Sequence, residues 1–209
     1  MIGVFGGSFD PVHYGHLRPV QETAAALALK PVLYIPSGRP PHRPPPRASA
    51  EDRVAMLRLA LGDDPGFRVD SREIERFGPS YTVETLESLR ETYRDATFCL
   101  LVGMDAFLGL PQWHRWEELF ELAHVAVMQR PGIPEPVTLP DWARERLCDS
   151  PRALARAPAG RCYIQPVTPL DISSTRVRER LARGLDVSQW LPPSVLEYIR
   201  EHRLYRGAR

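Results

Sequence analysis

The sequence predicts an α/β fold with one doubly wound, mostly parallel sheet and helices on both faces. Short apolar runs of strand length recur along the chain, and helical patterns separate most of them. The chain has 209 residues, 43% of them hydrophobic, and can bury a substantial core, so we expect a single domain over residues 1–209. The expected strands are residues 2–5, 32–35, 67–70, 97–102, 124–128 and 162–165.

Helices are expected between these strands. The clearest covers residues 50–61, where Ser49 and Asp52 are spaced as a capping pair before a stripe of apolar residues. Another helix opens at about Gly15, and a third covers residues 83–93. Strands that alternate with helices in this way are typical of a parallel sheet, because each parallel pair needs a long crossover connection.

Charge, cysteine content and hydropathy exclude several classes of protein. The net charge is only +1. Residues 141–209 carry 13 basic and 8 acidic side chains, and an excess of this size is typical of a solvated face. We therefore expect no nucleic-acid partner. The three cysteines are too few and too irregularly spaced for a disulfide framework or a zinc site. No apolar run approaches the roughly 18 residues of a membrane span and no basic leader precedes the first strand, so we expect a cytoplasmic protein with no membrane partner.

The most informative segment follows the first strand. Residues 6–17 read Gly-Gly-Ser-Phe-Asp-Pro-Val-His-Tyr-Gly-His-Leu. Gly6 and Gly7 allow backbone conformations in which main-chain N–H groups approach a polyphosphate closely. The helix start that follows adds unpaired N–H groups and a positive dipole end, and it places His13 and His16 where imidazole donors could meet a phosphoryl group.

Other roles are open for three of these residues. His13 and His16 could be metal ligands, but the sequence fixes no third ligand and the glycines would then be unexplained. Asp10 stands before Pro11, where an aspartate commonly caps a turn.

A second, distant segment completes the pattern. Residues 172–178 read Ile-Ser-Ser-Thr-Arg-Val-Arg. With the first segment, this chain resembles the nucleotidyltransferase superfamily, because its H-x-G-H and I-S-S-T-x-x-R elements are both intact. Two such elements together are far more specific than a lone glycine loop. The resemblance implies a Rossmann-like fold, and Ser173, Ser174 or Thr175 can also cap a last long helix whether or not a ligand is present.

Four further elements narrow the resemblance to the bacterial nicotinate mononucleotide adenylyltransferases. They occur in the family's order: residues 40–43, residues 79–82, residues 103–105 with Trp113, and residues 130–132. The resemblance covers residues 1–183, and residues 184–209 are expected to form a C-terminal helical tail. The implied reaction transfers the AMP moiety of ATP to the 5′-phosphate of nicotinate mononucleotide, giving nicotinate adenine dinucleotide and pyrophosphate in NAD biosynthesis.

The attacking phosphate in such a reaction is already an anion, so positioning and charge neutralisation carry the transfer. By resemblance, His16 contacts the α-phosphate, His13 helps to hold the triphosphate, and Arg178 holds the leaving phosphates, with Arg176 as a second candidate. Mg²⁺ is expected on the pyrophosphate side, bound mainly by ATP phosphates and water, without ligands from protein side chains. The resemblance implies ATP binding by Gly6, Gly7, Ser8, Phe9, His13, Gly15, His16, Gly103, Asp105, Ile172, Ser173, Ser174, Thr175 and Arg178.

The middle of the chain is expected to select the second nucleotide. Trp113 resembles the aromatic residue that stacks on the pyridine ring, and Thr82 and the main-chain N–H of His114 resemble the groups that bind the nicotinate carboxylate. This set favours an acid over an amide, because a main-chain N–H can only donate. Asp105 follows a strand, where an acid can accept ribose hydroxyls. Trp113 as an ordinary core residue and Asp105 as a helix cap are the alternatives.

A proline-rich loop, residues 36–47, follows the second strand. By resemblance, His42 and Arg43 fold over bound phosphates as a clamp, with Arg43 at the position where the family usually has lysine. Arginine keeps the charge but is not equivalent, because it presents a planar fork of donors. The alternative is a stiff surface loop.

Other functions stay open at the level of the sequence. The acceptor could be nicotinamide mononucleotide or phosphopantetheine, although Thr82 and Trp113 argue against both. A catalytically inactive nucleotide-binding regulator is the alternative from another class, and the intact His13 and His16 argue against it. The expected partners are the small molecules ATP and nicotinate mononucleotide, and a homo-oligomer is left open.

Overall fold

The computed structural model of the chain describes residues 1–41, 44–130 and 139–207. At its centre lies a six-stranded sheet in the order β3-β2-β1-β4-β5-β6, in which every neighbouring pair is parallel. The strands are β1 (Ile2–Gly7), β2 (Val32–Pro36), β3 (Phe67–Val69), β4 (Phe98–Gly103), β5 (His124–Gln129) and β6 (Cys162–Pro166). The chain runs outward in one direction from β1 and in the other from β4, as in a Rossmann-like sheet. The predicted fold is confirmed.

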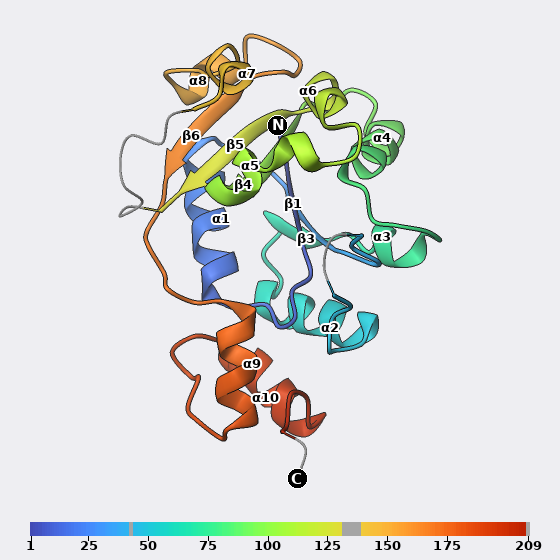
Figure 1. The fold of residues 1–209 in the computed structure, drawn as a ribbon, viewed down its shortest axis with the longest axis vertical. Coiled ribbons are helices and arrows are strands. Elements are labelled where there is room, and N and C mark those ends of the chain that lie inside the picture. The colour runs from blue at the N-terminus through green and yellow to red at the C-terminus, as the bar shows by residue number, and fades with distance from the viewer. Residues whose placement is uncertain (42–43, 131–138, 208–209) are drawn as a thin grey trace.

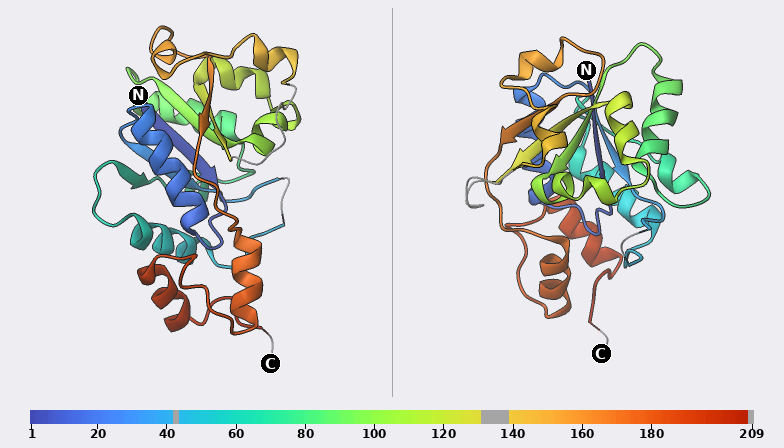
Figure 2. Two further views of the ribbon diagram at one scale, coloured as in Figure 1. Left: turned by 90° about the vertical axis from the view of Figure 1, so that its left-hand side faces the viewer. Right: turned by 45° about the horizontal axis from the view of Figure 1, so that its top comes forward.

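Helices cover both faces of this sheet (Figure 1). Figure 2 shows α1 along one face and α4 along the other. The helices of the described chain are α1 (Tyr14–Ala26), α2 (Ala50–Leu61), α3 (Arg72–Glu75), α4 (Thr82–Thr92), α5 (Met104–Leu108), α6 (Leu119–Leu122), α7 (Asp141–Arg144), α8 (Pro151–Leu154), α9 (Ser174–Ala182) and α10 (Pro193–Glu201), with 3-10 turns η1 (Leu110–Gln112) and η2 (Trp116–Glu118). No helix among the described residues has the length and apolar character needed to cross a membrane.

The sheet separates two hydrophobic cores. In β4, Phe98 and Leu100 pack in the core that contains α4 residues, whereas Cys99 and Leu101 pack in the core that contains α1 residues. Successive side chains of a strand point to opposite faces, so a strand covered on both sides is apolar throughout. This is why the expected strands could be recognised as continuous apolar runs.

The sequence located the main elements to within two residues. The helix expected at residues 50–61 has those bounds, and Ser49 caps it, with its Oγ accepting a hydrogen bond from the Asp52 N–H at 3.0 Å. The helix expected at residues 83–93 begins and ends one residue earlier. The four-residue helices α3, α6, α7 and α8 were not predicted, because a single turn has no periodicity to detect.

The C-terminal tail lies beyond the end of β1, where α9 and α10 are side by side (Figure 1). Helix α10 packs on α2 through two hydrogen bonds. Tyr198 Oη donates to Asp52 Oδ1 at 2.9 Å, and Ser194 Oγ donates to the Leu59 carbonyl at 3.1 Å. The tail is thus attached to the helix that follows the proline-rich loop.

The cap of α2 can be tested by substitution. We expect Ser49→Ala to lower the free energy of unfolding by about 1 kcal/mol, because it removes the acceptor for an N–H group at the helix start. Urea denaturation measures this change. Ser150→Ala is the matched control, since Ser150 precedes α8 without making a side-chain capping bond. Equal losses in the two variants would contradict the assignment of a capping role to Ser49.

Candidate active site

Two glycines mark the carboxyl edge of the sheet at the point where the strand order reverses. Gly6 is the last residue but one of β1 and Gly103 is the last residue of β4, and both are exposed. A Cβ atom added at either position would meet no atom within 4 Å. Main-chain groups on adjacent strands are therefore open to an incoming ligand at the place where sheets of this kind bind one.

The two distant sequence motifs meet at this edge. Ser174 Oγ, at the start of α9, donates to the Pro11 carbonyl at 3.0 Å, and Arg178 Nη1 donates to the Asp10 carbonyl at 2.7 Å. Gly15 makes the contact possible, because a Cβ there would lie only 2.9 Å from the carbonyl oxygen of Ile172. The buried Gly15 thus allows the two segments to approach each other closely, and its part in ATP binding stays a prediction.

Two residues implied for ATP binding have side chains in the hydrophobic core. Phe9 is fully buried and Ile172 is 8% exposed. The Phe9 ring packs against Phe5 and Tyr34, and its backbone has a φ of 48°, in the left-handed region. Because both side chains are buried, main-chain atoms are the groups of Phe9 and Ile172 that remain for a nucleotide contact, and their part in ATP binding stays a prediction.

The imidazole rings of His13 and His16 stack, with centroids 3.7 Å apart and planes inclined by 24°. His13 is 2% exposed, and neither of its ring nitrogens has a hydrogen-bond partner among the described residues. Burial, together with His16 and Arg130, lowers the pKa of His13 to about 2. His13 is therefore neutral at pH 7 and offers one N–H donor. Buried polar groups normally have partners, so a ligand phosphate fits this position.

A metal site is not supported by the same residues. The described chain contains no cluster of three or more His, Cys, Asp or Glu side chains that could bind a metal ion. The metal-ligand alternative for His13 and His16 thus finds no third ligand there.

The start of α9 presents polar groups beside residues 6–17, the segment that we call the phosphate loop. Ser173 caps this helix by accepting from the Arg176 N–H at 3.3 Å, while Thr175 is exposed and accepts from Arg178 Nη2 at 3.2 Å. Arg176 is engaged elsewhere: it donates to the Asp171 carbonyl, pairs with the Asp171 carboxylate and lies over the ring of Trp190. Arg178 faces the loop, so Arg176 as a second phosphate ligand is not supported.

A cavity of about 110 Å³ brings together residues from distant segments of the chain. Its lining includes Gly6 and Gly7, Thr82 at the start of α4, and Trp113 after η1. Trp113 is half-buried and also packs against the core, so the core alternative describes only part of its role. The groups expected to bind nicotinate and those expected to bind phosphate thus share one site.

Two cavity residues were missed at the level of the sequence. Glu73 and Thr85 line the cavity, and Thr85 Oγ1 donates to Glu73 Oε1 at 2.7 Å. Burial raises the pKa of the Glu73 carboxyl. Glu73 lies in the one-turn helix α3, outside every recognised motif, so no sequence signal pointed to it.

Two other expected ligands, Asp105 and His114, are exposed and do not line this cavity. Asp105 lies in the first turn of α5. The N-cap position of this helix is occupied by Gly103, so Asp105 is not the capping residue. Its carboxylate is left available for hydroxyl groups. The His114 ring is exposed and lies 4.3 Å from the ring of Tyr81, measured between centroids.

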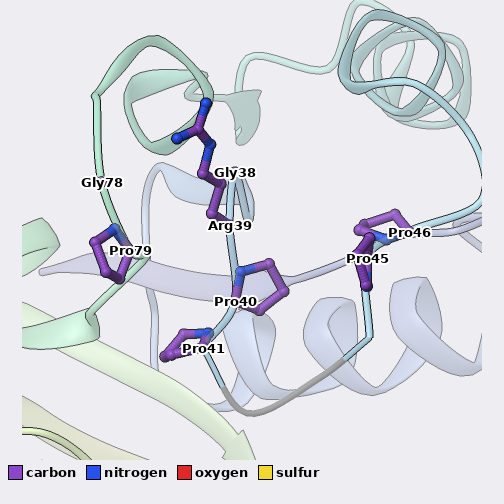
Figure 3. Close-up of a pocket in the computed structure, with 8 residues that line it drawn as sticks. All are labelled: Gly38, Arg39, Pro40, Pro41, Pro45, Pro46, Gly78 and Pro79. Carbon is purple, nitrogen blue, oxygen red and sulfur yellow. The ribbon is translucent and has the colours of Figure 1, made fainter.

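The proline-rich loop encloses a second, larger cavity of about 400 Å³. Figure 3 shows Pro40 and Pro41 on the outgoing limb, Pro45 and Pro46 on the returning limb, and Pro79 on the neighbouring segment. His42 and Arg43, the predicted clamp, lie outside the described residues. Proline rings supply no N–H donors, so Arg39 is the charged side chain among the described residues that line this cavity.

Comparison with known proteins places the chain in a family. The cytidylyltransferase-like family matches residues 4–180. A probable nicotinate-nucleotide adenylyltransferase of Methylococcus capsulatus is 48% identical over 208 residues, which cover 98% of this chain and 99% of the relative. The corresponding protein of Aeromonas hydrophila is 46% identical over 209 residues, covering 99% and 98% of the two chains.

Solved structures agree on the fold. The Plasmodium falciparum nicotinic acid mononucleotide adenylyltransferase complexed with NaAD has a TM-score of 0.73 at 17% identity, covering 98% of this chain and 96% of that chain. A putative nicotinate-nucleotide adenylyltransferase of Vibrio parahaemolyticus has a TM-score of 0.66 at 20% identity, covering 99% and 96%. Together with the sequence matches over nearly the full length, they show that the chain belongs to the cytidylyltransferase-like family and, within it, to the nicotinate-nucleotide adenylyltransferases, which are nucleotidyltransferase enzymes.

Proposed function

We propose that this enzyme transfers the AMP moiety of ATP to the 5′-phosphate of nicotinate mononucleotide, giving nicotinate adenine dinucleotide and pyrophosphate in NAD biosynthesis. One observation carries this proposal: the phosphate loop and the Thr82 and Trp113 side chains line one cavity, with α9 against the same loop. Both substrates can therefore reach a common edge of the sheet. The names of relatives that are 46–48% identical support the same reaction.

The residue roles follow from the demands of phosphoryl transfer. The attacking 5′-phosphate needs no general base, so the enzyme must hold two anions in line and stabilise the charge that develops. We assign His16 to the α-phosphate, where the charge changes, and neutral His13 to the triphosphate. Arg178 holds the leaving phosphates, since its guanidinium has five N–H donors and only part of them are used inside the protein.

Magnesium fits this site as part of the nucleotide. The phosphate loop itself contains the carboxylate of Asp10, and main-chain and side-chain donors occupy both of its oxygens. We therefore propose that Mg²⁺ is held by ATP phosphates and water, without protein side chains. Bound there, the ion would neutralise charge on the pyrophosphate.

The acceptor is proposed to be the acid and not the amide. Thr82 Oγ1 and the main-chain N–H of His114 would donate to the nicotinate carboxylate, with the pyridine ring on Trp113. A nicotinamide group would have to place its NH₂ beside donors, which is unfavourable. We also propose a cytoplasmic location, because the cysteines Cys99, Cys148 and Cys162 are free thiols, as is usual in a reducing compartment.

Acceptor choice provides the direct test of function. We expect Mg²⁺-dependent pyrophosphate release from ATP to be faster with nicotinate mononucleotide than with nicotinamide mononucleotide. Thr82→Val should lower kcat/KM for the nicotinate substrate about tenfold or more, because one donor to its carboxylate is lost. Thr92→Val is the matched control, since Thr92 lies in the last turn of the same helix and donates only to Ser88. Preference for the amide would overturn the proposed acceptor.

The role of His16 is tested by its removal. We expect His16→Ala to lower kcat by a factor of about 10² or more, because one preorganised donor to the reacting phosphate disappears. The measurement is pyrophosphate release at saturating substrates, with circular dichroism to verify folding. His202→Ala, which removes an exposed imidazole from the tail, should leave kcat unchanged. Turnover close to wild type in a folded His16→Ala variant would refute the assignment.

The neutral state of His13 predicts a pH dependence of stability. The imidazole takes up a proton near pH 6.5 in the unfolded chain but only near pH 2 in the folded protein. Below pH 6.5 the unfolded state therefore binds more protons, and acid lowers the free energy of unfolding. Between pH 7.5 and 5.5 we expect the wild type to lose about 1 kcal/mol more than His13→Asn, as measured by urea denaturation. Parallel pH profiles would show that His13 is not held neutral.

A further inference from the structure

We infer that the C-terminal tail is a working part of the triphosphate site, in which Tyr205 is a positioning residue that acts through Asp10 on Arg178. The inference rests on the proposed function only for the contact between Arg178 and ATP. Tyr205 follows α10, and neither it nor Asp10 belongs to the residues assigned above to substrate.

Asp10 is the meeting point of four segments. Its Oδ2 accepts from the Arg47 N–H at 2.8 Å, and its Oδ1 accepts from the Ala48 N–H at 3.0 Å and from Tyr205 Oη at 2.7 Å. Asp10 is 3% exposed and Tyr205 is 8% exposed. Asp10 is therefore not only the expected turn cap. Its carboxylate oxygens accept hydrogen bonds from residues 37 and 195 positions further along the chain, and so they connect distant segments.

Arg178 depends on the same residue. Its Nη1 donates to the Asp10 carbonyl at 2.7 Å and lies 3.5 Å from the Asp10 carboxylate. The carboxylate thus attracts the guanidinium that we assign to the leaving phosphates. How strongly it does so depends on which other donors satisfy it.

The Tyr205 hydroxyl is such a donor. It is neutral, because burial and the neighbouring Asp10 both raise the pKa of Tyr205 above its ordinary value. Without the hydroxyl, a buried carboxylate would lose one of its partners and draw the Arg178 guanidinium toward itself. The guanidinium would then be less available to a phosphate.

The same carboxylate also fixes the returning limb of the proline-rich loop. Arg47 and Ala48 come directly after the prolines and before α2, while Ser80 Oγ accepts from the Gly38 and Arg39 N–H groups at the outgoing limb. Each end of the loop is thereby attached by one side-chain acceptor. Loss of the Tyr205 hydroxyl would therefore also affect the Asp10 carboxylate that accepts from the Arg47 and Ala48 N–H groups at this end of the loop.

The tail itself is held in place by the core. Tyr205 belongs to the hydrophobic cluster that includes Leu191 and Ile199, and the Leu204 N–H donates to the Ile199 carbonyl at 3.0 Å. Tyr205 has a φ of 60°, a left-handed conformation that is uncommon for a side chain of this size. Packing and the bond to Asp10 together specify this conformation.

Two tyrosine variants separate positioning from stability. Tyr205→Phe and Tyr198→Phe each remove a hydroxyl of the tail that donates to a carboxylate, at 2.7 Å to Asp10 and at 2.9 Å to Asp52. Only the first carboxylate contacts Arg178. We expect Tyr205→Phe to weaken binding of Mg·ATP, measured by calorimetry without acceptor, and to lower kcat/KM for ATP by roughly tenfold, with KM for nicotinate mononucleotide unchanged.

A double-mutant cycle tests the route through Arg178. Tyr205→Phe should have little further effect on Mg·ATP affinity once Arg178→Ala is present, because residues that act as a unit are not additive. Tyr198→Phe should change neither affinity nor kcat/KM, whatever its melting temperature. The inference is overturned if Tyr205→Phe binds Mg·ATP as the wild type does, if both tyrosine variants weaken it equally, or if the cycle is additive. Since calorimetry needs no turnover, these outcomes are distinct from failure of the proposed transfer reaction.

Discussion

The site depends on the reversal of strand order between β1 and β4, the two central strands of the sheet. These strands are neighbours and parallel, with Ile2 beside Phe98, but their connections leave toward opposite edges of the sheet. Among the described residues, no atom would lie within 4 Å of a Cβ added at Gly6 or Gly103, so the main chain of both glycines is open at the carboxyl ends of these strands. The other parts of the site, namely Thr82, Trp113 and the start of α9, lie at or beside this edge of the sheet.

The segments that reach this edge of the sheet bring charge into a buried environment. Arg53 is 2% exposed and its Nη1 donates to the carbonyls of Ser8 and Ser37, which joins the phosphate loop to the base of the proline-rich loop. Asp10 and Arg178 form the second such link. Buried charges are costly unless they are paired, and a misplaced segment would leave them unpaired. This network therefore penalises any arrangement in which α9, α2 and the loop are not all in place.

Much of the fold could be predicted, because its signals are local. Strands buried on both faces are continuous apolar runs, and residues 50–61 carry both a cap and a helical stripe. The phosphate loop was expected at the carboxyl end of β1 from its position after the first strand, whereas Thr82 was expected in the site only from the family resemblance. The Asp10 to Tyr205 bond could not be predicted, since it joins side chains 195 residues apart and no pattern relates them. The same holds for Arg176, which turns to Asp171 and Trp190 through contacts that only the folded chain defines.

The distribution of charge in the proposed site suits the direction of the reaction. His13 is held neutral by burial, so the stacked imidazole pair does not bring two adjacent positive charges to the triphosphate. Arg178 is positive, and from the second turn of α9 its guanidinium reaches back to Thr175 Oγ1 in the first turn and to the Asp10 carbonyl. In the proposed roles, neutral His13 helps to hold the triphosphate, while the permanent charge of Arg178 lies at the leaving end. As the bond to pyrophosphate breaks, negative charge grows on that side, so the stronger electrostatic interaction forms in the transition state and not before it.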